Sequence, residues 1–270
     1  MKIKQYLCLF SLSLIFLGCS SEDTDSSNGV ITSHLPSAIG NYWTYDVETT
    51  INGEQTSGRD SLFVSGDLFL NDRVYKKMET LALPNGFYSS TLRNNGLRVD
   101  GSRVKLSGIA SYDLGLGNPI NLEITDFTIL KENANANEQL SSLNGDFSQV
   151  ISGYDLDFTY NLKSFNVSQL STFTSPNGTV YENVIRTKVV LNLRITTTQE
   201  LVAGFPPITI TVLAPQDVIT SFQYYAKDIG MVYTDTEITY QLQSIPNVII
   251  PIPLSGSQSQ EEFLDVYLVN

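Results

Sequence analysis

The strongest constraint on the fold of this chain is an alternation of apolar and polar side chains that recurs from about residue 40 onward. The clearest example covers residues 179–195, TVYENVIRTKVVLNLRI. A period of two residues is typical of a half-buried β-strand, because successive side chains point to opposite faces of the sheet. One face of this run carries Tyr181, Ile185, Val189, Leu191, Leu193 and Ile195, and the opposite face carries Glu182, Arg186, Lys188, Asn192 and Arg194.

Similar alternation appears in residues 43–51, 154–163 and 232–242, and turn sequences separate the runs. Asn-Gly at 52–53 predicts a tight hairpin turn, and Asp-Ile-Gly at 228–230 predicts another. In the run INLEITDFTIL the apolar parity changes between Ile124 and Phe127. That change predicts a β-bulge near Asp126.

Long amphipathic helices are missing from this pattern, and residues 132–143 fit either a short helix or a loop. The C-terminal run EFLDVYLV, residues 262–269, is apolar on both faces and predicts a strand covered on both sides that closes a barrel. We therefore expect an all-β protein with one domain over residues 35–270. Its fold is a single antiparallel β-barrel or a strongly curved half-barrel, preceded by a signal peptide and a disordered tether.

The first 18 residues have the organisation of a secretory signal peptide: two lysines, an apolar run over residues 7–17 and a small glycine. This run is too short to span a bilayer. The end of the run, FLGC at residues 16–19, resembles the lipobox of bacterial lipoproteins, with Phe in place of the commoner Leu. The resemblance implies cleavage before Cys19, lipidation of Cys19 and attachment to a membrane. The alternative is an ordinary secretory signal with a chance cysteine.

Residues 19–34 have the composition of an acidic, disordered tether. Ser20 follows the cysteine, whereas Asp at that place resembles an inner-membrane retention signal. The acidic tract SSEDTD resembles the surface-export signal of one large group of Gram-negative bacteria, although any solvated tether has a similar composition. We expect an outer-membrane lipoprotein exposed at the cell surface, with the periplasm-facing orientation as the alternative. His34 ends the tether, and no role is expected for it.

Charge and residue counts exclude several classes of function. The full chain has a formal charge of −12, and loss of residues 1–18, which hold two lysines and no acid, makes it −14. That balance argues against nucleic acid as a partner. After cleavage one cysteine (Cys19) and one histidine (His34) remain, so thiol, Ser-His-Asp and histidine-based metal chemistry lose their key residues. We expect no cofactor, no metal and no enzymatic activity. A hydrolase built on carboxylates alone is compatible with the composition.

Three segments carry a second resemblance: IGNYWTY at 39–45, SPNGTVYENVIRTKV at 175–189 and YYAKDIGMVY at 224–233. The order of these segments along the chain and their residue patterns are similar to those of uncharacterised bacterial secreted lipoproteins with GNxWxY, PxGTxxxNVI and YYAxGxGxV-like patterns. Asp228 stands where that group often has a small residue. The resemblance implies a lipocalin-like or lipoprotein-carrier-like β fold, and it implies no particular activity.

Some aromatic residues are candidates for lining a ligand site: Trp43, Tyr45, Phe205, Tyr224 and Tyr225. Core packing is the alternative explanation for these side chains. Two apolar, proline-punctuated segments, at 201–215 and 245–254, are candidates for the mouth of the barrel or for core strands with marked ends. Asp155 and Asp157 share a strand face, where they form either a paired-acid site or an ordinary solvated face.

The leading functional hypothesis is non-catalytic binding of an apolar small molecule, a glycan or an envelope protein by a lipid-anchored barrel. This hypothesis rests on fold-level analogy and on the missing catalytic groups. The alternatives are a structural or accessory subunit of an envelope complex and a carboxylate-only glycan hydrolase. A packed interior favours the accessory role, a cavity of several hundred Å³ favours binding, and two carboxylates in an open cleft favour hydrolysis.

Overall fold

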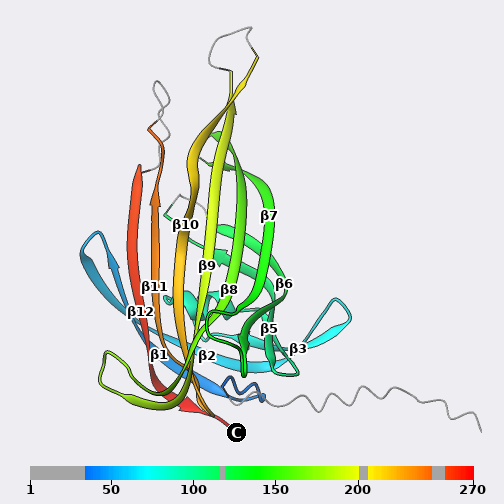
Figure 1. The fold of residues 1–270 in the computed structure, drawn as a ribbon, viewed down its shortest axis with the longest axis vertical. Helices are drawn as coiled ribbons and strands as arrows, with labels where there is room; N and C mark the ends of the chain where they lie inside the picture. Colours follow the sequence, from blue (N-terminus) through cyan, green and yellow to red (C-terminus); the bar gives the residue numbers. More distant parts are fainter. Residues whose placement is uncertain (1–33, 116–118, 152, 201–205, 245–252) are drawn as a thin grey trace, which may run out of the picture.

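The computed structural model describes residues 34–115, 119–151, 153–200, 206–244 and 253–270. Within these ranges the chain forms one antiparallel sheet of twelve strands that curls into a nearly closed barrel, together with one short helix (Figure 1). The strands are β1 (Tyr42–Ile51), β2 (Glu54–Leu70), β3 (Arg73–Glu79), β4 (Gly96–Asp100), β5 (Arg103–Tyr112), β6 (Ile120–Lys131), β7 (Gln139–Ile151), β8 (Tyr154–Thr174), β9 (Val180–Gln199), β10 (Ile208–Ala226), β11 (Gly230–Gln241) and β12 (Ser255–Leu268), and the helix is α1 (Phe87–Leu92). The predicted all-β barrel is confirmed.

The strand order is β6-β5-β4-β3-β2-β1-β12-β11-β10-β9-β8-β7. Consecutive strands therefore pair with each other except β6 and β7, and the C-terminal strand β12 pairs with the first strand β1 as well as with β11. The last strand thus joins an N-terminal half-sheet to a C-terminal half-sheet, and the free edges of the sheet are β6 and β7. Because β6 and β7 are joined by a short connection, the two edges are brought back towards each other.

Side chains of β8 fasten the β6 edge and the β6–β7 connection. The buried Ser164 hydroxyl donates to the carbonyl of Thr128 on β6 at 2.5 Å. The buried Asn166 amide donates to the carbonyl of Asn135 in the connection at 2.8 Å. Together with the backbone N–H of Asn166, which donates to the Glu138 carbonyl at 2.8 Å, these bonds link β8 to the β6 edge and to the connection, so they close the barrel where strand pairing stops.

The predicted turns are confirmed in detail. Asn52 and Gly53 have φ angles of 52° and 87°, the left-handed pair that a two-residue hairpin between β1 and β2 requires. Asp228 and Gly230 also have positive φ, and they reverse the chain between β10 and β11. The local sequence therefore sets these two hairpins.

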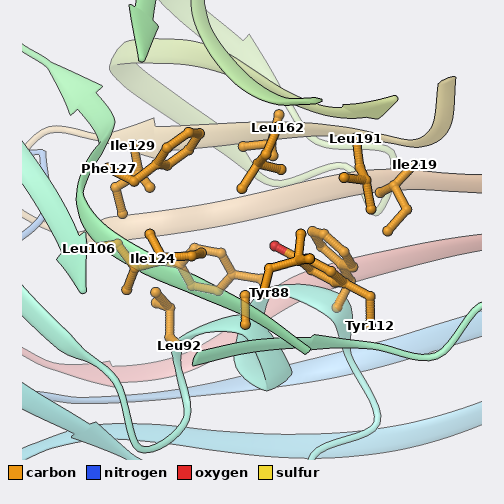
Figure 2. Packing of buried hydrophobic residues seen from close by; sticks show 14 of the residues in the cluster. Tyr88, Leu92, Leu106, Tyr112, Ile124, Phe127, Ile129, Leu162, Leu191 and Ile219 are labelled. Carbon is orange, nitrogen blue, oxygen red and sulfur yellow. The ribbon is translucent and has the colours of Figure 1, made fainter. Parts of the chain in front are cut away.

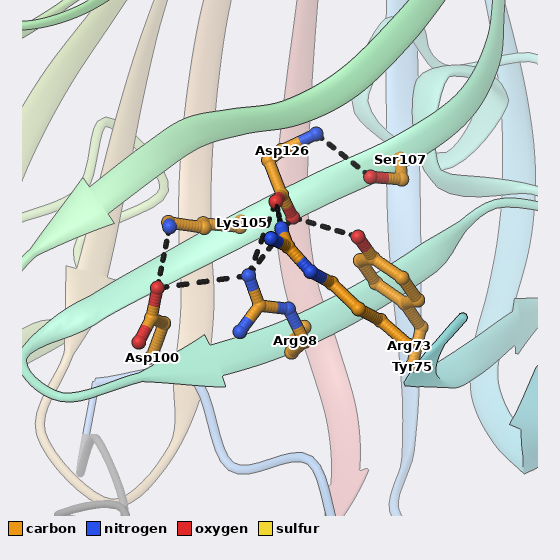
Figure 3. Close-up of polar contacts among 7 residues, drawn as sticks. All are labelled: Arg73, Tyr75, Arg98, Asp100, Lys105, Ser107 and Asp126. Carbon is orange, nitrogen blue, oxygen red and sulfur yellow. Dashed lines mark hydrogen bonds and ion pairs between the residues drawn. The ribbon is translucent and has the colours of Figure 1, made fainter. Parts of the chain in front are cut away.

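The predicted β-bulge is also confirmed. Thr125 and Asp126 of β6 together face one residue of β5, Ser107, and Asp126 has a φ of 50°. The bulge directs the Asp126 carboxylate at three partners (Figure 3): the Arg73 guanidinium, the Arg98 guanidinium at 3.1 Å and the Tyr75 hydroxyl at 2.7 Å. The Ser107 hydroxyl accepts the bulged Asp126 N–H at 2.8 Å. One bulge therefore ties β3, β4, β5 and β6 together.

Two sequence expectations need correction. Residues 132–143 are neither a helix nor wholly a loop, because β7 begins at Gln139. The C-terminal strand was predicted to be covered on both faces, but its last residues, Val266 to Leu268, are exposed, and the strand lies in the middle of the sheet between β1 and β11. The pairing of β12 with β11 ends at the pair Tyr233–Phe263, and the alternation of apolar residues alone does not predict that end.

His34 differs from the expected tether residue, because it is only 8% exposed. Its Nδ1 lies 2.8 Å from Glu132 Oε1, and its Nε2 lies 2.9 Å from the carbonyl oxygen of Asn183. The described chain is therefore fixed to the barrel from its first residue. The predicted signal peptide, Cys19 and the rest of the tether lie outside the described residues.

Asp126 gives a test of the bulge. We expect Asp126→Ala to lower the free energy of unfolding by about 2 kcal/mol, because Arg98 and the buried Tyr75 hydroxyl lose their acceptor. The matched control is Asp67→Ala, which removes a more exposed ion pair with Lys76 and should change stability by less than about 1 kcal/mol. Urea unfolding measures both values. Equal effects of the two substitutions would contradict the role of the bulge.

Candidate functional site

Two adjoining cavities form a groove in the mouth of the barrel, between α1 and the inner faces of β11 and β12. Their volumes are about 290 Å³ and about 540 Å³. Because the two cavities have several lining residues in common, they are parts of one site, which we call the mouth groove. The shared residues are Pro84, Asn85, Ser90, Asp113, Ile238 and Gln258.

The mouth groove combines neutral polar groups with apolar rings. Its polar side chains are mainly amides and hydroxyls: Asn52, Asn85, Ser90, Ser111, Ser255, Ser257, Gln258 and Gln260. Its apolar groups include Phe87 and Tyr112, whose rings stack at a centroid distance of 5.4 Å, and Tyr240 of β11. Arg93 and Asp113 supply one charge of each sign. Amides and hydroxyls donate and accept hydrogen bonds, so this lining suits a neutral ligand rich in both.

The floor of the groove is α1, a helix of only six residues. A helix this short is not stable by itself, and its first backbone N–H groups have no partner within the helix. The residue before it, Gly86, has no side chain with which to cap them. The partners come instead from strand side chains that point into the barrel.

Asp60 of β2 holds the approach to the helix. Its Oδ1 accepts the backbone N–H of Asn85 at 2.8 Å, and its Oδ2 accepts that of Gly86 at 2.7 Å. Asp60 is only 3% exposed, so these bonds form away from bulk water. Charge-assisted bonds of this kind are among the stronger hydrogen bonds in proteins.

Gln260 and Glu262 of β12 hold the next two residues. Gln260 Oε1 accepts the N–H of Phe87, and its Nε2 donates to the carbonyl of Asn85 at 2.9 Å. Glu262 Oε1 accepts the N–H of Tyr88 at 2.7 Å. Four successive backbone N–H groups, from residue 85 to residue 88, are therefore bonded to buried side chains of two strands.

Glu262 is completely buried, and burial raises the pKa of its carboxyl group from 4.5 to about 7. This pKa already includes a rise caused by the nearby Asp60 carboxylate and a lowering by the N–H groups of Tyr88 and Ser89 and by the Thr234 hydroxyl. Near neutral pH the Glu262 carboxyl is thus close to half protonated. The support of α1 contains a group that titrates in the physiological range.

Beneath α1 the barrel is filled (Figure 2). Tyr88 lies edge-on to Tyr45 and to Tyr225, at centroid distances of 6.1 Å and 6.2 Å. The small cavity on this side of the helix has a volume of about 20 Å³, which is room for about one water molecule. A ligand larger than that fits above α1 and not below it.

Three of the sequence-predicted lining residues belong to the packed interior. Trp43 is 1% exposed and donates its indole N–H to the carbonyl of Ile229 at 2.6 Å. Tyr45 and Tyr225 are also buried, and their hydroxyls donate to the Met231 carbonyl and to the Gln223 side chain. These three side chains line neither cavity of the mouth groove.

The other candidates have different positions. Tyr224 is half-buried, stacks on Phe173 at 4.2 Å and lies under the Arg186 guanidinium, away from the mouth groove. Phe205 lies outside the described residues, as do parts of both proline-punctuated segments. Of the second segment, Pro253 does line the groove.

Asp155 and Asp157 are exposed on β8, and the Asp157 carboxylate accepts a bond from the Ser148 hydroxyl at 2.6 Å. Among the described residues, no group of three or more His, Cys, Asp or Glu side chains could hold a metal ion. In the same part of the chain, no helix combines the length and apolar character needed to cross a bilayer.

Another cavity, of about 360 Å³, lies apart from the mouth groove, beside His34. Its lining is polar and includes Glu132, Asn183 and Lys227. Both ring nitrogens of His34 already contact Glu132 and Asn183, so this histidine serves to fix the start of the domain. The mouth groove is the better candidate for a ligand site because its polar groups combine with aromatic rings.

Comparison with protein-family models, with curated proteins and with solved structures gave no significant match. The function of the site therefore has to be inferred from its geometry.

Gly86 tests how closely α1 is fitted to its supports. A Cβ at this position would overlap the Glu262 carboxylate and lie 3.0 Å from Asp60 Oδ2. The backbone there is extended (φ −78°), so Gly86→Ala introduces no backbone strain, and its cost is purely steric. We expect a loss of about 2–4 kcal/mol in the free energy of unfolding.

The control for this substitution is Gly66→Ala, where nothing lies within 4 Å of the new Cβ. We expect it to change the free energy of unfolding by less than about 1 kcal/mol in urea titrations. A Gly86→Ala protein as stable as the control would show that α1 is not held tightly against Asp60 and Glu262.

Glu262 predicts a specific pH dependence. A carboxyl whose folded pKa is raised holds its proton in the folded state, so its favourable contribution is full below pH 4.5 and is lost as the pH rises through about 7. The wild-type protein should lose about 3 kcal/mol relative to Glu262→Gln between pH 4.5 and pH 8. Urea unfolding of both proteins at several pH values measures this difference. A constant difference across that range would contradict the prediction.

Proposed function

We propose that this protein is a lipid-anchored outer-membrane protein, exposed at the cell surface, that binds a neutral, hydroxyl-rich ligand such as a short glycan in the mouth groove without chemical conversion. The observation that carries the proposal is the groove lining, in which amides and hydroxyls surround aromatic rings. The ligand is the glycan of the initial hypothesis rather than the apolar molecule, because the barrel interior below α1 is already filled.

The chemistry of the groove fits sugar recognition. Side-chain amides such as those of Asn85 and Gln258 donate and accept at the same time, as sugar hydroxyls do. Tyr112 and Tyr240 also line the groove, and although they are only 3% and 6% exposed, their rings add apolar surface to its wall. The floor is rigid, because four backbone N–H groups at the start of α1 are bonded to the barrel wall.

The carboxylates support binding rather than hydrolysis. Glycoside hydrolysis normally uses two carboxyl groups about 5 to 10 Å apart on either side of the scissile bond. Asp113 is the single acid among the residues that line the mouth groove. The nearest buried acids, Asp60 and Glu262, are occupied by backbone N–H groups of the α1 region.

The proposed location, at the outer membrane, rests on the sequence. Cleavage after Gly18 and lipidation of Cys19 would leave a short acidic tether before His34. A single acyl chain gives marginal attachment, and several chains give a stable anchor.

A second candidate function is that of a structural or accessory subunit of an envelope complex. The observation that favours it is the filled barrel interior, which suits a rigid spacer as well as a binding protein. Binding of an oligosaccharide distinguishes the two functions.

Gln258 provides the test of glycan binding, because it lines both cavities of the groove. We expect the protein to bind at least one neutral oligosaccharide from a glycan array. Gln258→Ala should weaken that binding about tenfold, the effect of losing one or two hydrogen bonds. Calorimetric titration measures the affinity.

The matched control is Gln169→Ala, which removes a glutamine from the cavity beside His34. Its affinity should equal that of the wild type. Absence of binding across the array, or equal losses in both variants, would reject the mouth groove as a glycan site.

A further inference from the structure

The end of the barrel opposite the mouth groove carries exposed apolar side chains. The groove is lined by the first residues of β12, from Ser255 to Gln258, whereas the last residues of the same strand lie at the other end. Five large apolar side chains there are between 46% and 58% exposed. We call them the base patch: Ile39, Val180, Val266, Tyr267 and Leu268.

Three members of the base patch are consecutive, which is unusual for a strand in a sheet. Successive residues point to opposite faces, so exposure of Val266, Tyr267 and Leu268 means that both faces of β12 are uncovered. The cause is the end of pairing with β11 at Phe263, while pairing with β1 continues to Leu268. Past Phe263 the strand is therefore paired on one edge only, with β1.

The remaining members lie at the same end. Ile39 precedes Gly40 and Asn41, and Asn41 Oδ1 accepts the backbone N–H of Asn270 at 3.0 Å. Val180 begins β9, and its neighbour Tyr181 is close enough to Tyr267 to interact electrostatically. Figure 1 shows the turn between β8 and β9 and the C-terminus at the same end of the molecule.

The start of the described chain lies at this end too (Figure 1). His34 is fixed there by Glu132 and by the carbonyl of Asn183, five residues before Ile39. Cys19 is 15 residues upstream of His34. Even fully extended, 15 residues reach about 50 Å, and the average span of a flexible chain of that length is about 20 Å. A lipid on Cys19 therefore holds the base patch close to the membrane.

We propose that the base patch inserts into the lipid–water interface of the membrane that carries the anchor, so that the mouth groove faces away from it. This inference rests on the proposed lipidation of Cys19. Aliphatic side chains together with a tyrosine are the composition of an interfacial contact, since the ring packs among lipids and its hydroxyl stays in water.

The charges of the protein indicate which type of lipid the base patch contacts. The chain has a formal charge of −12, and the nearby turn exposes Lys227 and Asp228, one charge of each sign. Beside the base patch, Asp265 pairs with Arg59 and Glu182 is exposed, so the described charges next to it give no excess of cations that would draw it to anionic lipid. The contact is therefore apolar, and zwitterionic lipid suffices for it.

The experiment uses the chain from Cys19 onward, which keeps every described residue and has Cys19 as its single thiol. Coupling that thiol to a maleimide lipid in phosphatidylcholine vesicles supplies the anchor. The reporter is Tyr267→Trp, and the control is Ile51→Trp, an exposed position that lines the mouth groove. The native Trp43 is 1% exposed, and the wild-type chain gives its background.

In vesicles with brominated acyl chains, we expect the Tyr267→Trp reporter to lose roughly half of its added fluorescence, because interfacial groups reach about 5–10 Å into the lipid. The Ile51→Trp reporter should keep its fluorescence. Adding Val266→Ser and Leu268→Ser to the Tyr267→Trp chain should restore most of the lost intensity, with circular dichroism confirming the fold.

Three results would overturn the inference: no quenching of Tyr267→Trp, equal quenching of both reporters, or a blue-shifted Tyr267→Trp emission before vesicles are added. The last result would show contact between copies of the chain instead. Because the maleimide lipid supplies the anchor, absence of natural lipidation would not affect the outcome. Failure of glycan binding would not affect it either, so the two proposals fail separately.

Discussion

The structure depends on the hydrogen bonds that hold the start of α1 inside the barrel. A six-residue helix cannot stand alone, and its N-terminal N–H groups need acceptors. Asp60, Gln260 and Glu262 provide them from strands β2 and β12, which lie on either side of β1. The same bonds keep three polar side chains satisfied in a place where unpaired ones would be costly. The helix therefore needs the acceptors of the barrel wall, and the buried polar side chains of the wall need the N–H donors of the helix.

This constraint divides the molecule along its length. Below α1, aromatic and aliphatic side chains fill the interior around Tyr88, which leaves no room for a ligand. Above α1, the fixed helix forms the floor of a groove rich in amides and hydroxyls. At the far end, the last residues of β12 are paired with β1 alone, and apolar side chains are exposed near the start of the described chain. One strand thus contributes to the groove, to the support of the helix and to the base.

Local patterns in the sequence predicted the features that depend on neighbouring residues alone, which are the strands, the turns and the bulge. The alternation of apolar and polar residues predicted the strands, and Asn52-Gly53 predicted a hairpin. The change in apolar parity between Ile124 and Phe127 predicted the bulge at Asp126. The helix was missed because six residues give no helical period, and the Pro-Asn-Gly sequence at residues 84–86, directly before it, is typical of a turn. Glu262 gave no signal either, since an acid in a strand usually faces water and its inward position depends on β12 joining the two half-sheets. The candidate aromatics Trp43, Tyr45 and Tyr225 lie in the core because large rings fill a barrel whose interior is closed off by a helix.

The most direct test of the central claim is hydrogen–deuterium exchange at the start of α1. If buried side chains hold this helix, the backbone N–H groups of Asn85, Gly86, Phe87 and Tyr88 should exchange as slowly as those of the paired core of β12, because opening them requires unfolding of the barrel. Exchange as fast as that of an exposed loop would contradict the account, since the floor of the mouth groove would then open independently of the barrel.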